Sequence, residues 1–292
     1  MLWIILTAAA APLQVARNAL QRGLVGDAGP WGATLVRFLF GLPFALLIFS
    51  VVALLTPDAA PHLSSRFAIA VAAGAAGQVA ATAALLVAMR RSGFAVATFM
   101  QQSSLPLGAL MGVLVGDALS AQAWAGVAAT TLGLAVLSWP KAEMDKATRL
   151  GALFGLASGL AFGVTLNAYR QAGVALEPAH PIYAATASVC VAQALQSLGL
   201  GAFLAATRPA ALRAVAASWR QSLGAGFCGA AASACWFAAL AMAPAGAVRA
   251  VGVVEAPIAA AAGRRLFKER MTLRQMIGGA VTACGVVVTA LG

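Results

Sequence analysis

The sequence predicts an all-α membrane protein with ten transmembrane helices, arranged as two inverted-topology repeats of five. The first observation is composition: 62% of the 292 residues are hydrophobic and 9% are charged, whereas a soluble domain is about half apolar and about a quarter charged. The second is a succession of apolar runs of about 20 residues, the length that crosses a bilayer. The third is a similarity between the two halves of the chain.

Charged stretches and stretches with Pro or Gly separate the apolar runs. Each run is expected to be a regular helix, because lipid offers no partner to a free backbone group. The N-terminal run has no basic residue before it, so we interpret it as a span and not a signal peptide. Very short turns between Arg66 and Trp139 predict hairpin neighbours there. The predicted spans are Leu2–Gln21, Trp31–Leu55, Phe67–Met89, Phe94–Gly116, Ala121–Trp139, Leu150–Arg170, Pro181–Ala205, Gln221–Met242, Ala245–Gly263 and Met271–Leu291.

The basic stretch PKAEMDKATR divides the spans into five and five. We therefore predict a first repeat over residues 1–140, a linker over 141–149 and a second repeat over 150–292. Aligned pairs are Pro106 and Pro257, Asp117 and Glu269, Ser120 and Thr272, Gly126 and Gly278, Gly133 and Gly285, and Asn18 and Asn167. An odd number of spans per repeat inverts the second repeat in the membrane, an arrangement typical of transporters with a midplane site.

The distribution of Lys and Arg predicts the orientation. Loops that follow odd-numbered spans hold 14 of these residues, and loops that follow even-numbered spans hold 2. Basic loops stay in the cytoplasm, so both termini are predicted to be periplasmic. Basic residues at the ends of apolar runs are topology signals and do not form the basic face that nucleic acid needs.

The end of the chain resembles a known family. The run VVEAPIAAAAG, followed by GRRLFKERMTLRQMIGGAVTACGVVV, resembles the last two helices of an EamA-type repeat of the drug/metabolite transporter superfamily. The residues that carry the resemblance are Pro257, Glu269, Met271, Thr272, Gly278 and Gly285. The first half of the chain shows a weaker version of the same pattern, with Asp117 at the position of the acidic residue Glu269. The stretch LVRFLFGLPFALL resembles the family's second helix. The resemblance implies a central cavity between the halves, lined by helices 1–4 and 6–9.

Glu255 is the one acidic residue well inside a predicted span. A functional interpretation is that Glu255 meets a substrate ammonium or exchanges a proton. A structural interpretation is that it bonds the backbone near Pro257, which leaves the Val253 carbonyl without its helical partner, or pairs with a basic residue of another helix. Arg249, six residues earlier, points to a different side of the helix. Both interpretations stay open.

Other polar and aromatic residues within spans are candidates for substrate contact. Gln14 with Asn18, and Gln78 with Thr82, each share a helix face, which indicates either a wet cavity wall or interhelical hydrogen bonds. Phe162 and Trp236 would stack on a flat substrate or pack in the core. The candidate substrate-binding residues are Gln14, Asn18, Gln78, Thr82, Gln101, Phe162, Asn167, Trp236, Arg249 and Glu255. The paired prolines Pro106 and Pro257 are candidate hinges.

Arg17 and Arg37 are expected to extend to a membrane interface. The four cysteines and two histidines have no metal-ligand spacing, so we predict no metal site. No phosphate-binding loop is present, so no nucleotide or other cofactor is expected. The expected partners are a small-molecule substrate and the lipid bilayer, with protons as a candidate coupling ion, and a ten-helix unit could act as a monomer.

These observations favour a secondary transporter in place of an enzyme, since no second membrane acid or membrane histidine offers a catalytic constellation. The resemblance lies closest to bacterial inner-membrane exporters of aromatic amino acids. We therefore expect export of small metabolites, aromatic and other neutral amino acids above all, by alternating access. The alternatives are a cationic drug exporter of the same superfamily and a membrane protein with a structural role.

Overall fold

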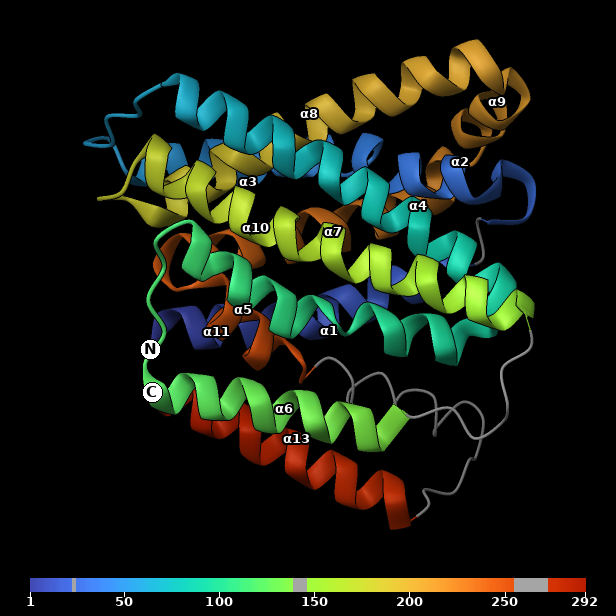
Figure 1. Ribbon diagram of the computed structural model, residues 1–292. Helices are drawn as coiled ribbons and strands as arrows, with labels where there is room; N and C mark the ends of the chain where they lie inside the picture. Colours follow the sequence, from blue (N-terminus) through green and yellow to red (C-terminus); the bar gives the residue numbers. More distant parts are fainter. Residues whose placement is uncertain (23–24, 139–145, 255–272) are drawn as a thin grey trace. The chain divides into compact units, whose positions relative to one another are not determined.

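The computed structural model describes residues 1–22, 25–138, 146–254 and 273–292, which are almost entirely helical (Figure 1). In chain order the helices are α1 (Leu2–Arg22), α2 (Val25–Leu39), α3 (Leu42–Leu55), α4 (Ser65–Gln101), α5 (Ser104–Leu114), α6 (Ala121–Ser138), α7 (Lys146–Leu176), α8 (Pro181–Thr207), α9 (Pro209–Ala217), α10 (Trp219–Met242), α11 (Ala245–Gly252) and α13 (Leu273–Leu291). The all-α prediction is confirmed for these ranges.

The helices form two compact units. Unit 1 contains Met1–Val79 and Ala168–Met242, and unit 2 contains Ala80–Asn167 and Ala243–Gly292. Helices α4 and α7 contribute residues to both units. Each unit draws on both sides of the predicted linker, so the repeats 1–140 and 150–292 are a separate, sequence-based division that stays a prediction.

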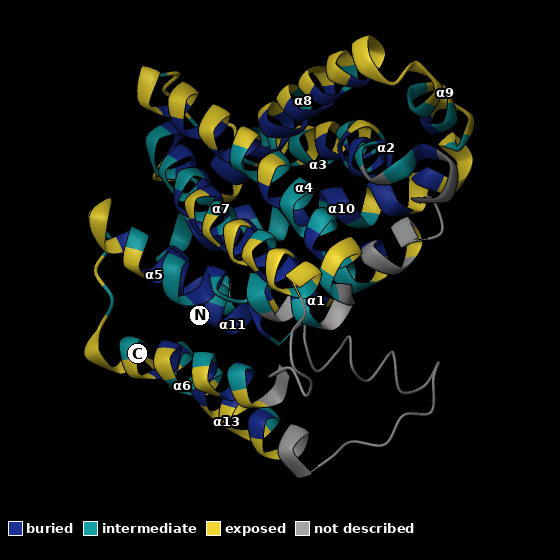
Figure 2. Cartoon of the chain, turned by 45° about the vertical axis from the view of Figure 1, so that its right-hand side comes forward, coloured by how far each residue is buried: buried dark blue, intermediate teal, exposed yellow. Residues whose placement is uncertain are grey.

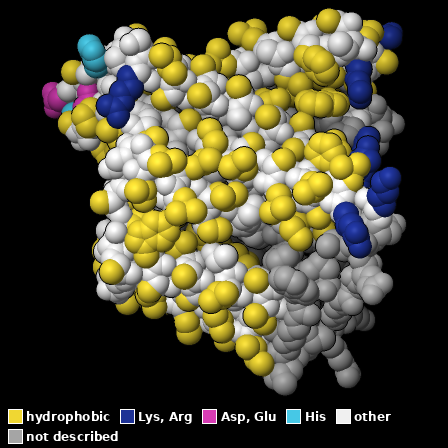
Figure 3. Space-filling view, viewed as in Figure 1, with side chains coloured by type: hydrophobic (Ala, Val, Ile, Leu, Met, Phe, Trp, Pro, Cys, Tyr) yellow, Lys and Arg dark blue, Asp and Glu magenta, His cyan; other side chains and the backbone are white. Residues whose placement is uncertain are grey.

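Burial on α8 is the reverse of burial in a soluble protein. The polar residues Gln193 and Gln196 are each 3% exposed, whereas Leu198 on the same helix is 72% exposed. Exposed apolar side chains also cover much of the face in Figure 3, and Figure 2 shows the buried sides of the helices turned inward. Such an apolar exterior is expected of helices that face lipid.

Five helical stretches are long and apolar enough to cross a membrane. They are Trp31–Leu55, Ser65–Ser92, Lys146–Leu176, Pro181–Thr207 and Trp219–Met242. Shorter apolar helices cover Leu2–Arg17, Ser104–Leu114, Ala121–Val136 and Ile277–Leu291. The membrane class is therefore supported, and the count of ten spans stays a prediction.

The predicted regular helix over Trp31–Leu55 is broken into α2 and α3. Pro43 lies at the start of α3 and has no N–H to donate to the Leu39 carbonyl, which interrupts the helical bonding. Gly41, at the break, packs against α10 and leaves no space for a side chain. A Cβ at Gly41 would lie 2.5 Å from the Arg37 carbonyl oxygen and 3.3 Å from the Gly226 carbonyl oxygen.

The long helix α4 changes direction relative to α7 within unit 2. Ser158 of α7 bonds to the Ala81 carbonyl and Gly151 lies against Ser92, which is an antiparallel order. Beyond that point the order is parallel, since Gly155 lies against Met100 and Gly159 against Ser103. The chain thus turns within the range of α4, near the predicted boundary between Met89 and Phe94.

Helices α6 and α13 pack closely through glycines. Gly133 lies against Thr282 and the Gly278 carbonyl, and Gly285 lies against Thr130 and the Gly126 carbonyl. In the alignment of the two halves, Gly126 corresponds to Gly278 and Gly133 to Gly285. This correspondence maps the first contact onto the second. This antiparallel, two-fold arrangement of the aligned glycines is the one that an inverted pair of helices would have, and the inverted repeat stays a prediction.

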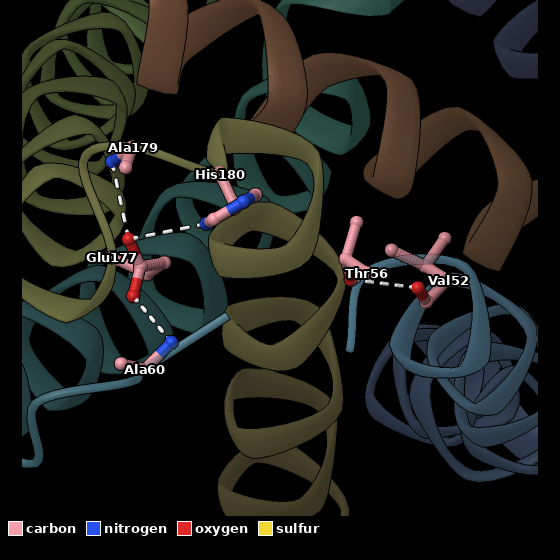
Figure 4. A network of polar contacts seen from close by, with 6 residues as sticks. All are labelled: Val52, Thr56, Ala60, Glu177, Ala179 and His180. Atoms are coloured by element: carbon pink, nitrogen blue, oxygen red, sulfur yellow. Dashed lines mark hydrogen bonds and ion pairs between the residues drawn. The ribbon is translucent and has the colours of Figure 1, made fainter. Parts of the chain in front are cut away.

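Glu177 ties together two connections of unit 1 (Figure 4). Its Oε2 accepts a hydrogen bond from the Ala60 N–H at 2.9 Å, and its Oε1 accepts one from the Ala179 N–H at 3.2 Å. His180 Nδ1 lies 3.5 Å from Oε1. The His62 N–H also donates to the Leu176 carbonyl at 2.7 Å. The connection between α3 and α4 is therefore held against the end of α7.

We expect acid to weaken this attachment. Burial alone would raise the pKa of the Glu177 carboxyl, but the hydrogen bonds from the Ala60 and Ala179 N–H groups and the nearby His180 imidazole hold the pKa below its ordinary value. A folded-state pKa below the unfolded value stabilises the protein above the unfolded pKa, and this stability is lost as pH falls through the folded pKa. The unfolding midpoint of the wild type should fall more between pH 7 and about pH 3 than that of Glu177→Gln, because the loss continues below the ordinary carboxyl pKa.

The matched control for this measurement is Asp58→Asn, because Asp58 is an exposed carboxylate of the same connection. The control should keep the acid sensitivity of the wild type. An equal loss of midpoint in the wild type and Glu177→Gln would show that Glu177 is not the group that titrates.

Candidate functional site

Three polar side chains of unit 1 meet in its core. The Tyr169 hydroxyl of α7 donates a hydrogen bond to Gln78 Oε1 of α4 at 3.1 Å. Gln196 Nε2 of α8 lies 2.7 Å from Gln78 Oε1, 3.1 Å from the Tyr169 hydroxyl oxygen and 3.2 Å from the Ala75 carbonyl oxygen. The amide has two hydrogens for these three acceptors. The predicted candidate Gln78 is thus part of a buried network.

An aromatic pair adjoins this network. The rings of Tyr169 and Phe237 have centroids 4.0 Å apart and planes inclined by 34°. Gly74 of α4 makes room for Tyr169, because a Cβ at Gly74 would lie 2.5 Å from the Tyr169 Cδ1 atom. The core of unit 1 therefore presents hydrogen-bonding groups beside flat apolar surface.

Two arginines of unit 1 lie over one glycine of α10. A Cβ at Gly229 would be 3.4 Å from Cδ of Arg17 and 3.5 Å from Cγ of Arg37. Arg17 is only 6% exposed, so the expectation that it extends to an interface is wrong. The absence of a side chain at Gly229 lets both arginine stems pack inside the unit.

Several buried polar atoms in the described residues have no hydrogen-bond partner. In unit 1 they include the side-chain oxygens of Gln193 and Gln196 and the indole nitrogen of Trp236. Nearly all buried polar atoms in proteins are paired, so unpaired ones need an explanation. Trp236 is one of the predicted candidates. Tyr169, Gln193 and Gln196 are not among them, although the two glutamines are polar residues three positions apart in an apolar run.

In unit 2, Arg249 holds the junction between α4 and α5. Its Nε lies 3.2 Å from Ser104 Oγ and its Nη2 lies 2.7 Å from Gln102 Oε1. The junction directly precedes Pro106, where α4 ends at Gln101 and α5 begins at Ser104. The break agrees with the bend predicted at Pro106, and its action as a hinge stays a prediction.

Asn167 also binds backbone in unit 2. Its Nδ2 donates to the Gly108 carbonyl of α5 at 2.8 Å and to the Gly163 carbonyl at 2.9 Å, while its buried Oδ1 has no donor among the described residues. The side-chain nitrogen therefore fastens α5 to α7 where Gly108 and Gly163 approach each other. This arrangement favours interhelical bonding as the role of the amide nitrogen.

The other predicted residues are spread over several helices. Gln14 is half-buried on α1, Thr82 and Gln101 are half-buried on α4, and Phe162 is half-buried on α7. Asn18 lies on α1, with a side chain outside the described part of the structure. Glu255 and Pro257 also lie outside the described residues. In those residues that are described, no group of three or more His, Cys, Asp or Glu side chains is placed to hold a metal.

The fold and these clusters define a helical integral membrane protein with polar groups in its core. Residues 149–291 match the EamA-like transporter family, and this match is consistent with the drug/metabolite transporter superfamily. A solved structure described only as a crystal structure of a protein is similar, with a TM-score of 0.71 and 16% identity, over 99% of this chain and 98% of that one. At this identity the likeness shows the fold alone. No curated protein matches the chain.

Proposed function

We propose that this protein is a secondary transporter that exports aromatic and other neutral amino acids across a bacterial inner membrane. The family match over residues 149–291 supports the transporter class. The substrate class rests on one observation: the core of unit 1 holds two arginine stems, amide oxygens and an aromatic pair. A zwitterionic amino acid needs a donor for its carboxylate, an acceptor for its ammonium and an apolar surface for its side chain.

Alternating access would rock the two sequence repeats about a midplane site, with Pro106 and Pro257 as matched bend points. Both termini would lie in the periplasm, and the chain would act as a monomer. Glu255 is the candidate group for proton exchange, or for contact with the substrate ammonium.

Proteoliposomes test the substrate class. We expect protein-dependent flux of phenylalanine and tryptophan, and no flux of the lipophilic cation tetraphenylphosphonium. Trp236→Ala should reduce phenylalanine transport about fivefold, because an aromatic contact contributes about 1 kcal/mol. Trp219→Ala is the matched control, since Trp219 is 48% exposed and should leave transport unchanged. Cation flux without amino acid flux would replace the proposal by a drug exporter.

A further inference from the structure

Two buried hydrogen-bond acceptors of unit 1 have no donor among the described residues. They are Gln193 Oε1 and Gln196 Oε1, and each residue is only 3% exposed. The two residues are three positions apart on α8, so they share a face of the helix. A buried acceptor without a donor is unfavourable, so two such acceptors on one face call for an explanation.

The break between α2 and α3 lies beside this pair. A Cβ at Gly41 would be 3.0 Å from Gln193 Oε1. Interrupted helices in membrane transporters commonly line substrate sites, since irregular backbone is tolerated in a membrane only where protein or a wet cavity surrounds it. The interrupted span is a second observation, independent of the glutamines, and such breaks are where membrane transporters commonly bind their ligands.

The surrounding charge limits the kind of donor. Two glycines three positions apart on α10 make the relevant contacts. Gly226 lies against Gly41, and Gly229 lies against the side-chain stems of Arg17 and Arg37. The stems of the two arginines and the helix break beside Gln193 are therefore about one helical turn apart along α10. An isolated cation would be repelled by the arginines, whereas an α-amino acid brings its own carboxylate next to its ammonium.

We propose that the side-chain oxygens of Gln193 and Gln196 bind the ammonium group of an α-amino acid, whose carboxylate lies toward Arg17 and Arg37. This inference rests on the proposed function and specifies which residues of unit 1 recognise the amine. The apolar side chain of the ligand would lie toward Tyr169 and Phe237, because the Tyr169 hydroxyl is 3.1 Å from Gln196 Nε2.

Equilibrium binding to the purified protein in detergent tests the proposal with three probes: phenylalanine, 3-phenylpropionate, which lacks the amine, and phenethylamine, which lacks the carboxylate. Wild type should bind phenylalanine at least about tenfold more tightly than either analogue, the effect of one charge-assisted hydrogen bond. Gln193→Leu should weaken phenylalanine at least about tenfold and 3-phenylpropionate by less than about twofold. Gln122→Leu is the control, because Gln122 is exposed on α6 of unit 2.

The unfolding midpoint without ligand separates recognition from a structural role. Leucine removes an unpaired buried acceptor, so the Gln193→Leu midpoint should stay or rise. A clear fall would mean that Gln193 holds a buried water or a structural bond, which overturns the inference. An equal loss of affinity for phenylalanine and 3-phenylpropionate in Gln193→Leu would also overturn it.

If phenylalanine is transported but Gln193→Leu binds it normally, the proposed function stands and the proposed ammonium site is wrong. If no probe binds the wild type, the subsite falls, and flux in proteoliposomes decides the proposed function separately.

Discussion

Valine in place of Gly285 should separate α13 from α6 and unfold unit 2. A Cβ at Gly285 would lie 2.5 Å from both the backbone nitrogen and the Oγ1 of Thr130, and 2.9 Å from the Gly126 carbonyl oxygen. Because two of these atoms are backbone, neither helix can accommodate the side chain by a rotamer change. Forcing extra atoms into a packed interface costs about 1–3 kcal/mol even where side chains adjust, so we expect a loss above about 3 kcal/mol.

The measurement is the unfolding midpoint and the yield of purified protein, each beside a matched variant on the same helix. Among the described residues, no atom lies within 4 Å of the position that a Cβ at Gly279 would take. Gly279→Val should therefore fold normally, with at most the small change in helix propensity between Gly and Val. A Gly285→Val protein as stable as Gly279→Val would show that α6 and α13 do not pack through these glycines.

The contact between α6 and α13 follows from the similarity between the two halves of the sequence. Gly126 and Gly133 align with Gly278 and Gly285, and the same four glycines lie in contact between the two helices. Helices that associate in lipid need small residues at the point of closest approach, so the spacing of the glycines carries structural information. A repeated pattern of small residues is thus readable from sequence because its physical cause is local to each helix.

The polar core of unit 1 is not readable in the same way. Gln193 and Gln196 are absent from the predicted candidates because polar residues in an apolar run have no direction until the neighbouring helices are placed. Arg17 is predicted at an interface, yet Gly229 of α10, more than 200 positions later in the chain, provides the space that buries it. The burial of a long charged side chain depends on such distant small residues, and a single sequence does not pair them.

The break between α2 and α3 is a middle case. Pro43 is visible in the sequence, and the loss of one backbone bond at Leu39 follows from its chemistry. A proline in a membrane helix produces either a kink within one helix or two separate helices, depending on what packs against it. Here Gly226 allows α10 to approach the Phe40–Gly41 backbone closely, and the span is divided.

Arg249→Met should abolish most transport by releasing the junction that precedes Pro106. Methionine keeps much of the apolar bulk of the side chain but removes the bonds to Ser104 Oγ and Gln102 Oε1, of which Ser104 is 2% exposed. Hydrogen bonds to a charged group contribute about 1.5–3 kcal/mol each. We expect a fall in stability of about 2–3 kcal/mol and at least a tenfold loss of phenylalanine flux.

A double-mutant cycle decides whether Arg249 positions the junction or binds the substrate carboxylate itself. If Arg249 positions the junction, Gln102→Leu alone should reduce flux. The double variant should then lose less flux than the sum of the two single losses, because both substitutions remove one shared contact. Arg249→Lys should recover only part of the flux, since an ammonium cannot reproduce the planar two-point contact. Arg213→Met is the control, because Arg213 is exposed on α9. Normal flux in Gln102→Leu, with additive losses in the double variant, would instead assign Arg249 to the substrate.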